Sequence, residues 1–364
     1  MDRRSFLKSG AALPVAAIPG LSRFAHADSV GAPWRVFEVT TQVEILEPAG
    51  ATRAWLPVPL TADTDYCKNL GNNWSADAGT ARYVQEPKYN AGIVAAQFEE
   101  GAQKPTLKVV SRFATRDRAV DLSRPANAPS ENPAVLKQSL AATALIPTTG
   151  IVRDTARDIT KGQRNDMDKA RAIYEWIVDN TFRDPKVRGC GWGDIQAMLE
   201  SRNLGGKCGD LNALFVGLAR SVGIPARDVY GIRVAKSRNG YVSLGANTDV
   251  ISKAQHCRAE FYVQGYGWIP VDPADVRKVV LEEPPGNLPL DAPKVKTARE
   301  RLFGSWEMNW LAYNYAHDVQ LPGSSGPRIP YFMYPNGETA RGRLDPLDPD
   351  AFRYVITARE IVLA

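Results

Sequence analysis

Histidine and cysteine are scarce in this chain. Only three of its 364 residues are histidine and only four are cysteine. His26 lies in an N-terminal stretch set aside below, so a mechanism that needs a histidine base must use His256 or His317. The even cysteine count is compatible with two disulfides, or with fewer if one thiol serves chemistry. The four are Cys67, Cys190, Cys208 and Cys257.

The chain also lacks a basic stripe and, beyond its N-terminal stretch, any run apolar enough for a transmembrane helix. Of its 45 basic and 40 acidic residues, four basic and one acidic lie within residues 1–27, which leaves 41 and 39 for the rest. This near-neutral balance gives no reason to expect nucleic acid as a partner. Internal repeats and low-complexity tracts are absent as well.

The first 27 residues read MDRRSFLKSGAALPVAAIPGLSRFAHA. The arginine pair Arg3–Arg4, a short weakly apolar stretch and the small residues Ala25 and Ala27 resemble a bacterial twin-arginine export signal. The alternative, a membrane anchor, fits less well because the apolar stretch is too short to span a bilayer. We therefore predict a signal peptide over 1–27 and an exported protein, periplasmic or extracellular.

The region after the signal alternates apolar and polar residues. Residues 34–59 break at Pro48–Gly50, which predicts a hairpin of two strands. Together with further strand patterns, this predicts an N-terminal β-sandwich-like domain over 30–125. A stretch rich in Pro, Ser and Asn then predicts a linker over 126–160. The further strand patterns lie at 81–86, 92–99 and 105–115.

Residues 161–280 change from helical to strand periodicity, which predicts an α+β core domain. The helical patterns cover 166–182, 193–203 and 208–222. The strand patterns cover 227–234, 256–264 and 267–273. Residues 281–364 form a proline-rich loop and an aromatic extension, ending in a strand at 352–363, which we expect to complete the core.

A cysteine stands at the start of the third helix, in the segment GGKCGDLN at 205–212. Backbone N–H groups at a helix N-terminus favour negative charge, and the neighbouring Lys207 adds to the effect. Cys208 is therefore a candidate nucleophilic thiolate. The alternative is that Cys208 is a small buried residue of a packed helix.

His256 heads one predicted strand and Asp272 ends the next, with a turn near Tyr266. Two antiparallel strands joined by a tight turn bring their far ends together, so the side chains can be adjacent. A sheet packed on the helix N-terminus would then supply a nucleophile, a base and an orienting carboxylate. Asp275 is the rival third member, and a satisfied core histidine is the alternative for His256.

The segments GGKCGDLNALFVGLARSVGIPAR and AQHCRAEFYVQGYGWIPVDP resemble the core of the transglutaminase-like superfamily over about 165–280. The resemblance implies a papain-like thiol fold. It also implies a Cys208–His256–Asp272 triad that acts on amide or ester carbonyls through a thioester. The sequence departs from the usual His-x-Trp-x-Glu pattern, because Arg258 stands in the tryptophan position.

Three further residues are candidates for substrate or oxyanion contacts: Trp192, Lys207 and Arg258. Lys207 and Arg258, if they flank the thiolate, would attract an acidic substrate. The first oxyanion donor is expected to be the backbone N–H of Cys208 itself. If Cys208 stays free, the preferred disulfide joins Cys190 to Cys257, which flank the site in sequence.

The sequence thus predicts an exported thiol acyl-transfer enzyme, with hydrolysis favoured over cross-linking. The expected substrate is a peptide or protein, with cell-wall peptides as one candidate, and no cofactor or metal is expected. One alternative is a catalytically silent binding module of the same fold. Another is a zinc site, which the spacing of the cysteines disfavours because adjacent residues on a strand point to opposite faces.

Overall fold

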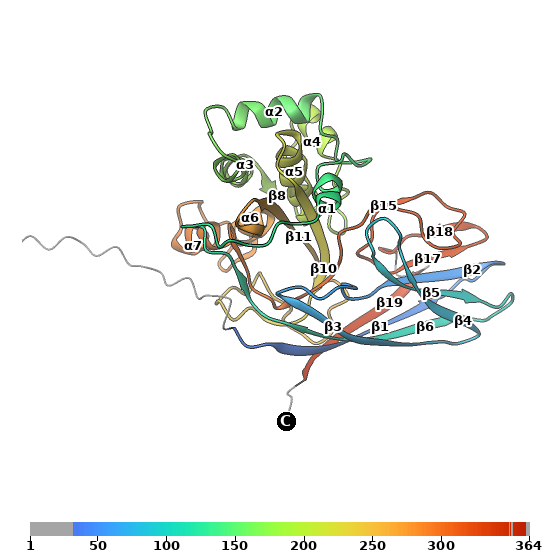
Figure 1. Cartoon of the computed structure of the whole chain (residues 1–364). Coiled ribbons are helices and arrows are strands. Elements are labelled where there is room, and N and C mark those ends of the chain that lie inside the picture. Colours follow the sequence, from blue (N-terminus) through green and yellow to red (C-terminus); the bar gives the residue numbers. More distant parts are fainter. Residues whose placement is uncertain (1–31, 349, 351, 362–364) are drawn as a thin grey trace, which may run out of the picture.

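The computed structural model describes residues 32–348, 350 and 352–361. The predicted signal, residues 1–27, lies outside the described residues. The chain forms a β-rich body and, above and to its left in Figure 1, a body of helices packed on a sheet. Among the described helices, none combines the length and apolarity that crossing a bilayer requires.

Two antiparallel sheets form the β-rich body. The first has the order β19 (Phe352–Ile361), β1 (Arg35–Ile45), β6 (Thr106–Thr115) and β3 (Cys67–Ala76). The second has the order β18 (Gly342–Leu344), β17 (Asn336–Thr339), β2 (Thr52–Pro57), β5 (Gly92–Phe98) and β4 (Gly79–Gln85). Apolar side chains of both sheets, among them Val43, Leu56, Val94 and Leu107, share one buried cluster. The predicted β-sandwich is therefore present.

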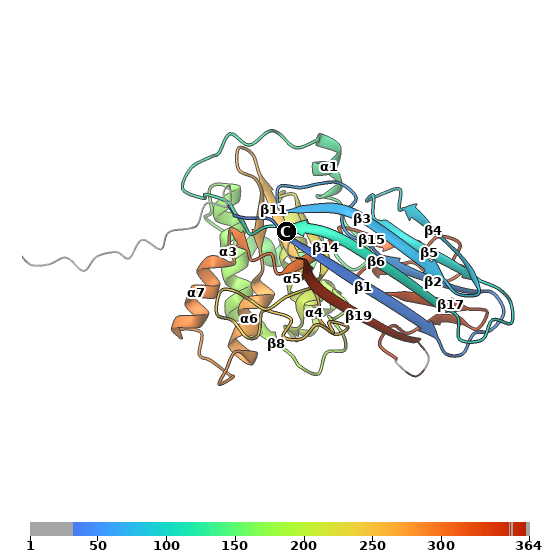
Figure 2. The ribbon, with the colours of Figure 1, turned by 90° about the horizontal axis from the view of Figure 1, so that it is seen from below.

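The predicted domain boundaries differ from the observed ones. The sandwich takes β17, β18 and β19 from the C-terminal region, and β19 pairs with β1 from Val36↔Ile361 to Ile45↔Phe352 (Figure 2). Residues 281–364 therefore complete the sandwich as well as the core. This return of the chain covers a strand edge that would otherwise leave backbone groups unpaired, and local sequence patterns do not encode it.

The predicted hairpin over 34–59 is also wrong. β1 and β2 are both strands, but they belong to different sheets, so the Pro48–Gly50 connection carries the chain across the sandwich. The alternating pattern locates a strand and its buried face, whereas the strand's neighbour depends on tertiary packing.

The predicted linker over 126–160 is partly helical. It contains α1 (Pro133–Gln138) and α2 (Ile151–Ile159). Val152 and Ala156 of α2 are fully buried in the cluster that fills the core body. Because α2 packs into this cluster, the core begins before residue 161.

The core sheet has the antiparallel order β12 (Gly267–Val271), β11 (Gln255–Val263), β10 (Ala226–Arg233) and β14 (Trp310–Asn314). Against it lies α5 (Cys208–Ser221), with Phe215 of α5 and Phe261 of β11 in ring contact at 5.9 Å. The predicted α+β class, with the cysteine helix packed on an antiparallel sheet, is confirmed. The remaining helices are α3 (Asp166–Asn180), α4 (Ile195–Ser201), α6 (Pro273–Glu282) and α7 (Pro293–Arg301).

The helix α5 is central rather than amphipathic. Every residue from Cys208 to Arg220 is buried, because other helices cover the face that the sheet leaves open. Polar residues inside such a helix need partners. The side chain of Asp210 bonds the backbone N–H of Lys207, and the side chain of Asn212 bonds the carboxylate of Asp272. Both bonds belong to the site described below.

Three short strand pairs form further joints in the fold: β7 (Arg118–Ala119) with β13 (Ser305–Trp306), β8 (Phe182–Arg183) with β9 (Gly205–Gly206), and β15 (His317–Val319) with β16 (Ile329–Tyr331). The first of them links the sandwich to the core, because β7 follows β6 and β13 follows α7. At the first of these joints Arg118 and Arg227 both bond the carboxylate of Glu260, which is fully buried on β11. Arg227 Nε lies 2.6 Å from Glu260 Oε1, and its guanidinium stacks 3.8 Å from the ring of Trp268. The joint between sandwich and core is thus a buried ionic cluster.

Candidate active site

Cys208 is the first residue of α5, where the N–H groups of the first turn have no intrahelical acceptor. The carboxylate of Asp210 fixes this turn. It accepts the N–H of Lys207 at 2.9 Å and the N–H of Gly193 at 3.0 Å, so the helix start and the preceding loop are held together. Gly191 of that loop has a φ of +90°, and a Cβ there would lie 1.8 Å from Asp210 Oδ2. Only glycine fits this approach.

His256 and Asp272 lie at the open end of the β11–β12 hairpin. The strands pair from Val263↔Gly267 to Ala259↔Val271, which leaves the two residues just beyond the last pair. His256 Nε2 is 2.7 Å from Asp272 Oδ2. Because Nε2 faces the carboxylate, Nδ1 is the ring nitrogen left for the cysteine thiol.

The pKa values of the cysteine and the histidine move toward each other. Contacts with the thiols of Cys190 and Cys257, and with His256, lower the pKa of Cys208 well below its usual value against the opposing effect of burial. Burial and Arg233 lower the pKa of His256, but nearby carboxylates outweigh them and raise it overall. These shifts favour a thiolate–imidazolium pair.

Asp272 accepts two hydrogen bonds besides its contact with His256. Its Oδ1 accepts the side-chain N–H of Asn212 at 3.2 Å and the backbone N–H of Asp275 at 3.0 Å. Asn212 lies one turn after Cys208 on α5, so a single helix carries the thiol and a support of the carboxylate. Asp272 is also the N-cap of α6, where the helix dipole favours negative charge, but burial and the neighbouring Asp275 raise its pKa overall against the opposing effect of His256.

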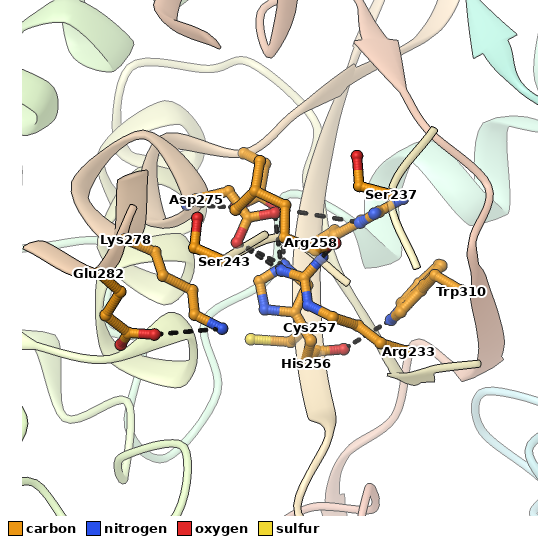
Figure 3. A network of polar contacts seen from close by, with 12 residues as sticks. Arg233, Ser237, Ser243, His256, Cys257, Arg258, Asp275, Lys278, Glu282 and Trp310 are labelled. Atoms are coloured by element: carbon orange, nitrogen blue, oxygen red, sulfur yellow. Dashed lines mark hydrogen bonds and ion pairs between the residues drawn. The ribbon is translucent and has the colours of Figure 1, made fainter. Parts of the chain in front are cut away.

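A second carboxylate lies beside the first. Asp275 Oδ1 is 3.4 Å from His256 Nε2, and its two oxygens are 2.5 and 2.8 Å from Arg233 Nη2 (Figure 3). Arg233 and His256 hold the pKa of Asp275 well below its usual range despite burial. Asp272 is the closer partner of His256, and Asp275 adds negative charge behind the imidazole.

His256, Asp272 and Asp275 also have the spacing of a metal-ligand set. Their donor atoms are already engaged, however: Asp275 with Arg233, and His256 Nε2 with Asp272. The arrangement therefore suits holding a proton on the imidazole better than binding an ion.

The other predicted site residues lie in different surroundings. Lys207 lines the cleft beside Cys208 and His256. Trp192 is 73% exposed and does not line this cleft.

Arg258 is buried behind the triad, where its Nε is 3.7 Å from Asp272 Oδ2 and its guanidinium packs on Trp310. Burial and Arg233 lower the pKa of Arg258 to about 10. Arg258 therefore faces the carboxylate and not the substrate cleft, contrary to the expectation from sequence.

The predicted disulfide is not formed. All four cysteines are free thiols in the structure, and the thiols of Cys190 and Cys257 both contact the sulfur of Cys208. Each is therefore engaged with the candidate nucleophile and not with the other. Cys67 lies apart at the start of β3, where burial raises its pKa to about 12.

His317 lies outside the cleft lining. It is buried between Tyr230 and Asp228, with its Nε2 3.3 Å from Asp228 Oδ2 and its Nδ1 3.4 Å from the hydroxyl of Tyr230. These contacts give His317 a place in the fold apart from Cys208, so His256 is the histidine that shares the cleft with the thiol.

Sequence reasoning missed several residues of the site. Asn212, Arg233 and Lys278 support or line it, and none was singled out from sequence. One signal was available: Pro273 after Asp272 is typical of a helix start, and a helix there places residue 275 one turn after 272 and residue 278 one turn after 275.

The cleft above Cys208 and His256 has a volume of about 700 Å³. Its described lining contains seven basic side chains and no aspartate or glutamate. The basic residues are Arg183, Arg188, Lys207, Arg233, Lys253, Lys278 and Arg353.

Comparisons with known proteins agree with this geometry. Residues 153–273 match the sequence profile of the transglutaminase-like superfamily. An uncharacterized protein of Haemophilus influenzae is 33% identical over 371 residues, which cover 96% of this chain and 99% of that one. The chain belongs to the transglutaminase-like superfamily.

Solved structures match the chain at lower identity. A candidate cysteine protease from Cytophaga hutchinsonii superposes with a TM-score of 0.50 at 14% identity, over 90% of this chain and 99% of that one. The periplasmic domain of TgpA from Pseudomonas aeruginosa gives a TM-score of 0.36 at 13% identity, over 72% of this chain and 92% of that one. The first of these supports a shared fold, and the second is too distant to do so.

Proposed function

We propose that this protein is an exported thiol hydrolase that cleaves amide bonds of a peptide or peptide-like substrate. The observation that carries the proposal is the lowered pKa of Cys208 at a helix N-terminus, in one cleft with a histidine 2.7 Å from a carboxylate. Superfamily membership agrees with thiol chemistry. The export part rests on the twin-arginine pattern at 1–27.

The reaction follows from the positions of the groups. The Cys208 thiolate attacks the scissile carbonyl carbon, and the backbone N–H of Cys208 stabilises the oxyanion. The C–N bond breaks as His256 gives its proton to the leaving amine, and a thioester remains on Cys208. His256 then takes a proton from water, the hydroxide attacks the thioester, and the acid leaves while the proton returns to the cysteine–histidine pair. Asp272 stabilises the imidazolium throughout.

Water is the proposed acceptor because a cross-linking acceptor would be a lysine amine. A protonated lysine carries positive charge, and the described cleft lining is basic without an acidic side chain. The approach of such an amine is disfavoured, whereas water is unaffected.

An activated ester tests the proposal without knowledge of the natural substrate. After brief exposure to p-nitrophenyl acetate and acid quench, mass spectrometry should find an acetyl thioester on Cys208 and none on Cys67. Added lysine amide should leave the rate of deacylation unchanged, since water resolves the thioester. Deacylation accelerated by lysine amide, with acetyl-lysine amide as the product, would assign cross-linking instead. Acetylation only at other residues would refute the thiol mechanism.

A further inference from the structure

The cleft carries more positive charge than its surroundings neutralise. Five of its seven basic side chains share four carboxylates: Arg233 pairs with Asp275, Arg188 with Asp345, Arg353 with Glu44, and Arg183 and Lys278 both with Glu282. Lys207 and Lys253 make no ion pair among the described residues. Like charges confined to one concave surface repel each other, and an anionic ligand would relieve that repulsion.

Lys278 is the most informative of these residues. It lies on α6, one turn after Asp275, and its side chain is only 18% exposed. Figure 3 shows its amino group joined to the carboxylate of Glu282, and Lys278 and His256 line the same cleft. Its partner Glu282 is 3.5 Å away and 36% exposed, and it is shared with Arg183. Lys278 is thus a largely desolvated cation, and among residues 32–348, 350 and 352–361 its one ion-pair partner is a carboxylate that Arg183 shares.

The direction of the pKa shift of Lys278 agrees with a desolvated cation that is only partly neutralised. Burial and the charges of Arg233 and Arg183 lower its pKa, against the opposing effect of Glu282 and Asp275. A carboxylate entering the cleft would supply the missing negative charge at a place water reaches poorly.

We infer that the cleft selects an acidic peptide, with Lys278 binding a carboxylate next to the scissile amide and Lys207 and Lys253 contacting further carboxylates at the rim. This rests on the proposed function for the scissile amide, whereas the carboxylate site itself depends only on the basic lining. Lys207 is half-buried at the start of α5 and Lys253 is exposed, so the three lysines line the cleft from different parts of the chain.

Two alkylating reagents of similar size test the inference and the proposed function separately. Iodoacetamide is neutral and reports the Cys208 thiolate, whereas iodoacetate carries a carboxylate. We expect the iodoacetate-to-iodoacetamide rate ratio at Cys208 to exceed that of free cysteine. In Lys278→Gln the ratio should fall about three- to tenfold, because the ratio cancels any change in thiolate reactivity and retains the effect on the carboxylate. Lys278→Arg should restore most of the ratio.

Control variants distinguish the effect of a positive charge inside the cleft from the effect of a positive charge elsewhere on the protein. Lys253→Gln, at an exposed position that should fold normally, should lower the ratio by a smaller factor than Lys278→Gln. Lys296→Gln, exposed on α7 and outside the cleft lining, should leave it unchanged. Equal ratios in wild type, Lys278→Gln and Lys253→Gln would overturn the carboxylate site even if iodoacetamide labels Cys208 rapidly.

If iodoacetamide does not label Cys208, the proposed function fails and binding decides the inference. Cys208→Ala should then bind a fluorescent glutamate-rich peptide at least about tenfold more tightly than its glutamine counterpart at low salt. This preference should diminish in a variant that combines Cys208→Ala with Lys278→Gln. Equal binding of the two peptides would overturn the inference.

Discussion

Replacing Cys208 with serine is expected to reduce the release of p-nitrophenolate from p-nitrophenyl acetate by about 10³–10⁴-fold. The neutral serine hydroxyl has a much higher pKa than a thiol, so the histidine cannot hold it ionised as it does Cys208. His256→Ala should cause a comparable loss, because it removes both the base and the positive charge that stabilises the thiolate. The double variant should be little worse than either single one, since the two residues act as a unit.

Asp272→Asn should reduce the release of p-nitrophenolate less than Cys208→Ser or His256→Ala does. Asp275 still lies 3.4 Å from His256 Nε2 and keeps negative charge behind the imidazole. Circular dichroism would establish that each variant is folded. If Cys208→Ser retained wild-type turnover, or if Asp272→Asn lost more than His256→Ala, the assigned roles would be contradicted.

Replacing Glu260 with glutamine is expected to lower the free energy of unfolding by about 3–5 kcal/mol. The carboxylate is fully buried and bonds both Arg118 and Arg227, whose charges lower its pKa even though burial raises it. Glutamine keeps the shape of the side chain but removes the negative charge between the two guanidinium groups, and of these Arg118 keeps a more distant carboxylate, Asp65 at 3.8 Å. Urea denaturation followed by tryptophan fluorescence would measure the change.

A solvent-exposed ion pair supplies the matched control. Glu47 and Arg341 are 3.5 Å apart with side chains 68% and 63% exposed. Glu47→Gln should leave the free energy of unfolding unchanged within about 0.5 kcal/mol. A Glu260→Gln effect no larger than that of Glu47→Gln would show that the buried cluster does not hold the sandwich to the core.

The sequence predicted those parts of the fold that depend on local pattern. The cysteine helix was expected at 208–222 and occupies 208–221, and the strands from 227 to 273 agree within a few residues. The pairing of β19 with β1 and the separation of β1 from β2 were not predicted. Strand partners far apart in sequence are chosen by tertiary packing, and an alternating pattern carries no information about them.

In the candidate site, too, the residues in recognisable local contexts were predicted, and those placed by tertiary packing were not. Cys208, His256 and Asp272 each stand in a recognisable local context, at a helix start, a strand start and a strand end. The placement of Arg233 depends on how β10 is registered against β11, and that of Asn212 on how α5 is rotated over the sheet. Such relations exist only once the sheet and the helix have packed, so the residues behind the triad could not be read from sequence.

The most direct test of the account is the pH dependence of Cys208 alkylation by iodoacetamide, measured by peptide mass spectrometry in wild type and His256→Gln. Only the thiolate reacts, so a lowered pKa keeps the rate high until the pH falls through that value. We predict a wild-type inflection well below the value of about 8.5 for a free cysteine, and a move toward that value in His256→Gln. An inflection near the free-cysteine value in both folded proteins, or a Cys208 that never reacts, would contradict the account.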